Sequence, residues 1–129
     1  MAYPISIKGV LFVEGQVVLV RNGRNEWELP GGRLEPGEAP EQTLAREFQE
    51  ELSIRVEARK IIDSYLFQVI PSQHVFVVTY GCRLLGEFAP VVSEEHAEFG
   101  LHAPADLGRI ALPVGYARSI HAWSTHAGS

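Results

Sequence analysis

The chain of 129 residues carries a formal net charge of −5 and a single cysteine. This length favours one domain over residues 1–129. The negative charge argues against a protein that binds nucleic-acid polymers, because such binding depends on basic patches. One cysteine excludes a disulfide within the chain, and no apolar stretch approaches the length of a membrane span. Because the first residues lack a signal-peptide pattern, we expect a cytoplasmic protein without a membrane partner.

Runs of β-branched and apolar residues predict a series of strands. The predicted strands are Ile5–Val13, Gln16–Arg21, Trp27–Leu29, Arg55–Ile70 (one or two strands), His74–Leu85 and a short strand ending near Leu101. The predicted helical segments are Pro40–Leu52, a single turn over Pro104–Leu107, and Gly115–Trp123. Strands combined with two helices predict an α/β domain with a mixed central sheet.

A loop rich in glycine and proline leads directly into the predicted helix that begins at Pro40. Proline suits the first helical position, where its missing amide would have no partner in any case. Leu44, Phe48 and Leu52 follow one another at intervals of four residues, and Ala45 widens their stripe. This spacing predicts that one face of the helix packs against a core.

Three glutamates occupy the helix face beside that apolar stripe. At roughly 100° per residue, Glu47, Glu50 and Glu51 fall on neighbouring positions, so their carboxylates can converge. Like charges at this spacing destabilise a helix unless a cation lies between them. Carboxylates without sulfur or imidazole suit hard ions such as magnesium or manganese. A solvated acidic face is the alternative, but the position of the glutamates beside the buried stripe and the glycine-rich loop favour a metal site.

The spacing of these residues resembles the signature of the Nudix hydrolases. Gly32 is followed after five residues by Glu38, and after seven more by the run Arg46–Ile54, which reads Arg-Glu-Phe-Gln-Glu-Glu-Leu-Ser-Ile. Eight of the nine fixed or class-restricted positions match over 23 residues, and Trp27–Gly31 resembles the usual lead-in. The departure is Ser53, where the family has glycine at the end of the helix. A left-handed residue commonly ends a helix there, so the departure affects the turn and no carboxylate.

The resemblance implies an α/β/α sandwich and a hydrolase that cleaves a nucleoside diphosphate linked to a further group. It assigns the main Mg²⁺ ligands to Glu50 and Glu51, with Mn²⁺ as a substitute ion. The backbone carbonyl of Gly31 adds an oxygen in many members. Glu47 matches a position that serves as a metal ligand or as the general base.

Two further roles follow from the resemblance. Arg46 is expected to orient a signature glutamate rather than contact phosphate directly, and Glu38 is expected to support the site from behind. The other dense acidic cluster is Glu94, Glu95, His96 and Glu98. Glu98 resembles the downstream glutamate that MutT-like members add as a metal ligand. For Glu94 a solvated loop is an equal alternative.

Substrate contacts are expected from the loops. Arg21 and Arg24 could reach phosphate from the turn after the second strand, with surface solvation as an equal alternative. Gly32 lets the backbone approach a ligand closely.

Within the family, a MutT-like enzyme that converts a nucleoside triphosphate to the monophosphate and pyrophosphate is favoured. The alternative substrate class is ADP-ribose or another nucleoside diphosphate derivative. A homodimer is compatible with the family. A non-catalytic nucleotide sensor on the same fold is the competing class, but such relatives commonly lose signature carboxylates that this chain keeps.

Overall fold

A computed structural model describes residues 2–94 and 98–124. In chain order its elements are β1 (Ile5–Val13), β2 (Gln16–Arg21), β3 (Trp27–Glu28), β4 (Gly31–Arg33), α1 (Pro40–Leu52), β5 (Arg55–Ile70), β6 (Gln73–Leu85), β7 (Glu98–His102), the 3₁₀ helix η1 (Pro104–Arg109) and α2 (Val114–Ser124). The predicted helices and long strands are confirmed, and β5 is one continuous strand rather than two.

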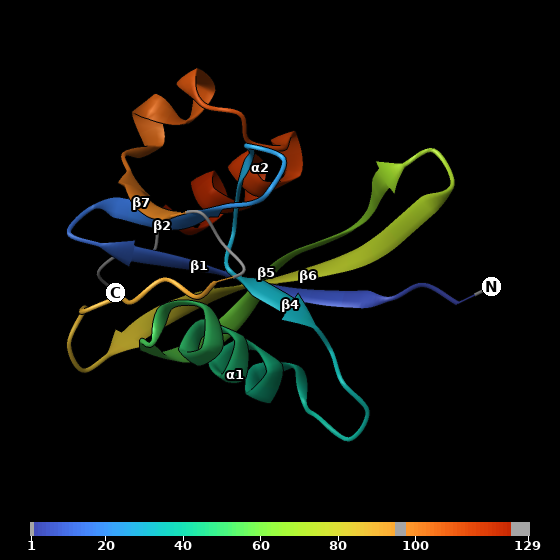
Figure 1. The fold of residues 1–129 in the computed structure, drawn as a ribbon, viewed down its shortest axis with the longest axis horizontal. Coiled ribbons are helices and arrows are strands. Elements are labelled where there is room, and N and C mark those ends of the chain that lie inside the picture. Colours follow the sequence, from blue (N-terminus) through green and yellow to red (C-terminus); the bar gives the residue numbers. More distant parts are fainter. Residues whose placement is uncertain (1, 95–97, 125–129) are drawn as a thin grey trace.

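The strands form a mixed sheet with β1 at its centre. Along the sheet the order is β3-β2-β1-β6-β5, while β4 also pairs with β1 and β7 also pairs with β2. β1 runs parallel to β6 and antiparallel to β2 and β4. Figure 1 shows α1 on one side of the sheet and α2 on the other. The expected α/β/α sandwich is therefore confirmed.

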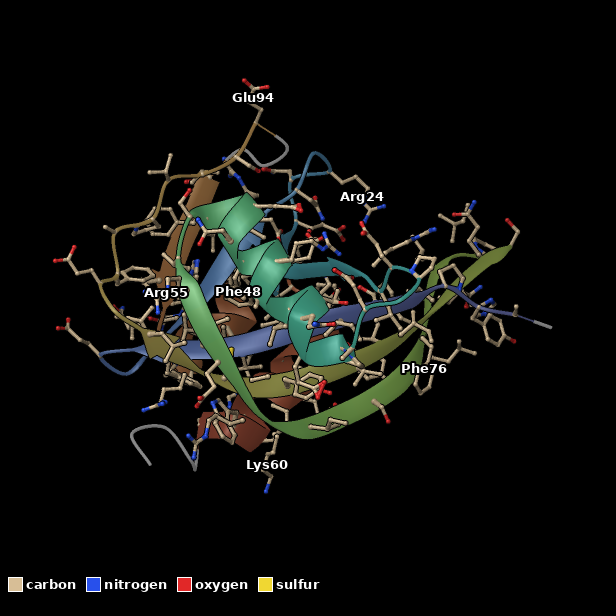
Figure 2. All side chains as sticks on the ribbon, turned by 90° about the horizontal axis from the view of Figure 1, so that it is seen from below. Arg24, Phe48, Arg55, Lys60, Phe76 and Glu94 are labelled. Atoms are coloured by element: carbon tan, nitrogen blue, oxygen red, sulfur yellow. The ribbon has the colours of Figure 1, made fainter. Side chains whose placement is uncertain are left out.

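Helix α1 packs on the sheet through its predicted apolar stripe. Leu44, Phe48 and Leu52 are fully buried, and Figure 2 shows Phe48 beneath the helix ribbon, on the side of the strands. A Cβ atom at Gly9 of β1 would lie 2.7 Å from the Phe48 ring, so the helix sits close to the strand because that residue is glycine. Ala45, expected to widen the stripe, is instead exposed.

The strand β4 was not predicted, because its residues read as part of the glycine-rich loop. Its glycines pair with β1 through backbone groups alone, with Ile7 opposite Gly32 and Lys8 opposite Gly31. Gly31 has a φ of 145°, and a Cβ atom there would collide with the Ile7 carbonyl oxygen. Only glycine permits this approach, so the loop is anchored to the central strand.

The remaining boundaries differ from the predictions by a few residues. η1 is longer than the predicted turn, and α2 begins one residue earlier and ends one residue later than expected. Among the described residues, no helix is both long enough and apolar enough to cross a membrane.

Helix α1 ends at Ser53 in the left-handed conformation that the family's glycine would adopt. Ser53 has φ 55° and ψ 36°, and its amide donates to the Gln49 carbonyl at a distance of 3.0 Å. Serine at this position therefore keeps the left-handed turn, although this conformation is strained for a residue with a Cβ atom.

We expect Ser53→Gly to stabilise the protein by about 1 kcal/mol, because glycine adopts this conformation without a clash at Cβ. The corresponding rise in Tm is about 3 °C. Thermal unfolding followed by circular dichroism measures it. A clear fall in Tm would show that the serine hydroxyl stabilises the turn by a bond of its own.

Candidate active site

The guanidinium of Arg46 lies at the centre of the carboxylates on α1. Its Nε donates to Glu38 Oε2 at 2.7 Å. Its Nη1 donates to Glu47 Oε1 at 2.9 Å and to Glu50 Oε1 at 3.0 Å. Its Nη2 donates to the Arg33 carbonyl at 3.2 Å. One cation thus links the helix, the end of β4 and the loop between them.

Glu38 fixes the position of Arg46 from the loop side. Its carboxylate accepts bonds from two nitrogens of Arg46 and from the Thr43 hydroxyl, the latter at 2.8 Å. These hydrogen bonds, first those from Arg46 and then that from Thr43, lower the pKa of Glu38 to about 2. The carboxylate is therefore ionised at any physiological pH and is a permanent partner for the guanidinium.

Glu51 points inward, toward the glycine-rich segment. The residue is 3% exposed, and its Oε2 accepts a hydrogen bond from the Gly31 amide at 2.9 Å. A buried carboxylate is costly unless such donors reach it. The unusual backbone of Gly31 therefore has a direct consequence for the site, because it aims an amide at a signature glutamate.

Glu47 lies between Arg46 and β4. A Cβ atom at Gly32 would collide with its carboxylate, so glycine at that position leaves the space that Glu47 fills. Burial raises the pKa of Glu47, against the opposing effect of Arg46. The half-buried carboxylate of Glu47 therefore accepts a proton more readily than an exposed glutamate does.

These side chains border one open cleft of about 450 Å³. The lining residues are Glu35, Arg46, Glu47, Glu50, Glu51, Ser93 and Glu94. The far wall is held against the helix because the Ser93 amide donates to the Glu51 carbonyl at 2.9 Å. Glu94 stands at the rim of this cleft, and its exposed side chain points outward into solvent (Figure 2). Glu95 and His96 lie outside the described residues.

The donor chemistry of the cleft fits a hard divalent cation, since its ligating atoms are carboxylate oxygens. In the described part of the chain, however, no group of three His, Cys, Asp or Glu side chains is arranged to hold a metal ion. Arg46 bonds Glu47 and Glu50, while Glu51 bonds the Gly31 amide. The three carboxylates share a cleft, and Glu47 and Glu50 would have to turn from Arg46 to share an ion.

The residues expected from outside the helix lie elsewhere. Arg21 forms an ion pair with Glu98, its neighbour across strands β2 and β7. Neither residue lines the cleft bordered by α1. Arg24 projects from the loop between β2 and β3 (Figure 2) and pairs with Glu26 at 3.3 Å.

Sequence reasoning missed one charged residue near the site. Lys8 stands in the middle of β1 and is 7% exposed, and its Nζ donates to the Leu29 carbonyl at 3.0 Å. A single lysine inside a strand of β-branched and apolar residues was the signal that could have drawn attention to it, because lysine is rarely buried without a partner.

The fold and the cleft together define an α/β domain that gathers ionised carboxylates around a glycine-rich loop. The sequence profile described as "NUDIX domain" matches residues 3–123. The chain therefore belongs to the NUDIX domain family.

Known proteins with similar sequences or structures carry related names. The chain is 44% identical over 57 residues to an 8-oxo-dGTP diphosphatase of Proteus vulgaris, covering 41% of this chain and 50% of that protein. It is 29% identical over 99 residues to a putative ADP-ribose pyrophosphatase of Bacillus subtilis, covering 72% and 48%. The chain thus spans about half the length of these relatives. A crystal structure described as an ADP-ribose pyrophosphatase from Streptococcus suis has a TM-score of 0.76 and 25% identity, over 99% of this chain and 94% of that one.

The lowered pKa of Glu38 predicts a specific acid sensitivity. Because this pKa lies below its ordinary value, the stabilisation is fully present above about pH 4.5 and is lost as the pH falls toward 2. Glu38→Gln should therefore lower Tm at neutral pH, and the difference from the wild type should vanish near pH 2. Thermal unfolding from pH 2 to 7 tests this, with the exposed Glu87→Gln as the control. A difference that stayed constant across this range would contradict the assignment.

Proposed function

We propose that this protein is a magnesium-dependent pyrophosphohydrolase that cleaves a nucleoside diphosphate-linked substrate by attack of water at phosphorus. The observation that carries the proposal is the cleft in which Glu47, Glu50 and Glu51 meet a glycine-rich segment. The substrate's diphosphate is strongly anionic, so a cleft lined by carboxylates repels it unless cations are present. A site of this composition therefore makes chemical sense for phosphoanhydrides only with bound divalent ions.

Glu50 and Glu51 are proposed as the main residues that hold the ion, with the Gly31 carbonyl as a further oxygen donor. When bound, Mg²⁺ neutralises phosphate charge and makes water a stronger nucleophile at neutral pH. Glu47 is proposed for both roles that the resemblance gives it, ligand and acceptor of the water's proton. Its raised pKa and its position beside Gly32 support the second role.

Arg46 and Glu38 are proposed to act together. By accepting bonds from Arg46, Glu38 holds the guanidinium where it meets Glu47 and Glu50, so that both glutamates start from fixed positions. Gly32 is proposed to let the backbone approach a phosphate group closely once Glu47 turns out of the space beside it. These roles concern orientation, and they require that the Glu38–Arg46 pair persists when the glutamates turn toward an ion.

Three residues outside α1 are proposed to reach the substrate or the ion only after they leave their present ion-pair partners: Arg21, Arg24 and Glu98. Glu98 can act as an additional ligand only after it leaves Arg21, and the same movement frees Arg21 for a phosphate. Arg24 forms an ion pair with Glu26, and both side chains are exposed. Ion pairs of this kind contribute less than about 1 kcal/mol to stability. That weak pair leaves Arg24 available to an anionic substrate.

A nucleoside triphosphate is the preferred substrate, cleaved to the monophosphate and pyrophosphate, and the name of the Proteus relative supports this choice. ADP-ribose is the alternative, supported by the names of the Bacillus and Streptococcus relatives. A homodimer formed through the sheet, where β5 is an edge strand, is also proposed and is checked by analytical ultracentrifugation.

A substrate panel separates the enzyme from a nucleotide sensor. Purified protein is incubated with Mg²⁺ and with each of the standard and oxidised nucleoside triphosphates, ADP-ribose and 5′-triphosphorylated RNA, and the products are resolved by chromatography. We expect release of a nucleoside monophosphate and pyrophosphate from a triphosphate, abolished by EDTA and restored by Mg²⁺. Tight binding of a nucleotide without turnover of any compound would support the sensor.

Substitution of the glutamates tests their proposed roles. Glu50→Gln or Glu51→Gln should each lower kcat by about a thousandfold, because charge stabilisation by the ion is lost. Glu98→Gln should have a smaller effect, and titration of the metal-free proteins with Mn²⁺, followed by electron paramagnetic resonance, shows whether each residue is a ligand. Glu87→Gln serves as the surface control. Full activity in both Glu50→Gln and Glu51→Gln would refute the site.

A further inference from the structure

Lys8 is a buried cation that the proposed mechanism does not use. It lies at the centre of β1, the strand that pairs with β2, β4 and β6. Burial of an ammonium is costly, and a methionine of similar length would fill the same space without that cost. The retention of a lysine here therefore calls for a role that depends on its hydrogen bonds or its charge.

The ammonium of Lys8 is part of a short series of contacts that fix the segment Leu29–Gly31 to β1. Lys8 Nζ donates to the Leu29 carbonyl at 3.0 Å, and the Gly9 amide donates to the Pro30 carbonyl at the same distance. Lys8 itself stands opposite Gly31 in the sheet. Three consecutive residues of the segment are thus held by two neighbouring residues of the central strand.

The same segment supplies the donor that orients Glu51. The Gly31 amide donates to Glu51 Oε2 at 2.9 Å in a buried setting. Only Pro30 separates Gly31 from Leu29, and its carbonyl is itself bonded to the Gly9 amide of β1. A change in the position of the Leu29 carbonyl, two residues away, is therefore transmitted to the amide that holds the carboxylate.

The surroundings keep Lys8 charged and available as a donor. Its Nζ lies 5.8 Å from the centre of the Tyr116 ring. Burial by itself lowers the pKa of Lys8, but the polar and acidic groups around it, chiefly Tyr116 and Glu28, outweigh that effect and raise it above its ordinary value. Glu51 and Glu47 contribute in the same direction.

We propose that Lys8 is a positioning residue for the active site: its ammonium holds the Leu29 carbonyl and so fixes the Gly31 amide against Glu51. The inference rests on the proposed function, in which Glu51 holds the ion, but its first consequence is visible in the metal-free protein. Loss of the ammonium leaves a buried carbonyl without its donor and loosens the segment Leu29–Gly31.

Lys8→Met keeps the length of the side chain and removes its donor and its charge, whereas Lys8→Arg keeps both. Lys60→Met is the control for loss of a lysine, since Lys60 lies on the exposed edge strand β5 and points away from α1 (Figure 2). Ile120→Val in the core beneath α2 is the control for a mild loss of stability, expected to be about 1 kcal/mol. Thermal unfolding confirms that each variant is folded.

The first measurement is hydrogen exchange of the Gly31 amide by NMR in metal-free protein. Lys8→Met should speed this exchange about tenfold relative to both controls, and Lys8→Arg should restore most of the protection. The second measurement is Mn²⁺ affinity, which should fall about tenfold in Lys8→Met while KM for substrate changes little.

Unchanged exchange of the Gly31 amide in a folded Lys8→Met variant would overturn the proposal. Tighter Mn²⁺ binding in this variant would also overturn it, because the ammonium would then act by repelling the ion. Loss of protection equal to that of Ile120→Val would assign Lys8 to general stability and would also overturn it. If the wild type bound no Mn²⁺ and turned over no substrate, the proposed function would fail, while the exchange result would still decide whether Lys8 positions Glu51.

Discussion

A single guanidinium, that of Arg46, makes this arrangement of carboxylates possible. Glu47 and Glu50 share one helix turn and would repel one another without a cation between them. Arg46 bonds both, and its remaining nitrogens reach Glu38 and the end of β4. Arg46 therefore offsets part of the negative charge of the site, and it occupies oxygens of Glu47 and Glu50 that a metal ion would use.

The rest of the fold sets the distance between that helix and the glycine-rich segment. Phe48 packs on β1 where Gly9 leaves room, which brings the helix close to the strand. Gly31 and Gly32 then pair with the same strand: the Gly31 amide donates to Glu51, and the missing side chain of Gly32 leaves the space that Glu47 fills. Packing of the core and geometry of the site thus depend on the same few close contacts, all of them centred on β1.

The sequence predicted the parts of this design that are local and periodic. The stripe of Leu44, Phe48 and Leu52 and the start at Pro40 follow from spacing along one helix, and the structure confirms them. Serine in place of the family's glycine left the turn after the helix open, and the structure shows that Ser53 keeps the left-handed conformation. Strand β4 was missed because backbone pairing with β1 leaves no pattern of side chains. The pair between Arg21 and Glu98 joins strands 77 residues apart in sequence, a separation across which spacing carries no information. The sequence also does not specify that Arg46 bonds both Glu47 and Glu50, because this depends on the rotamers that the three side chains adopt.

The two cations beside the carboxylates differ in how easily they can be displaced. The Glu50 side chain is 54% exposed and its pair with Arg46 is correspondingly weak, whereas the Glu38 side chain is 18% exposed and bonds two nitrogens of the guanidinium. The divalent ion proposed above would therefore compete with Arg46 for Glu50 first, while Glu38 keeps the guanidinium in place. Lys8 lies on the buried side, where it is 7% exposed and donates to the Leu29 carbonyl. The exposed pair at Glu50 and the buried bond at the Leu29 carbonyl therefore differ in how readily solvent reaches them.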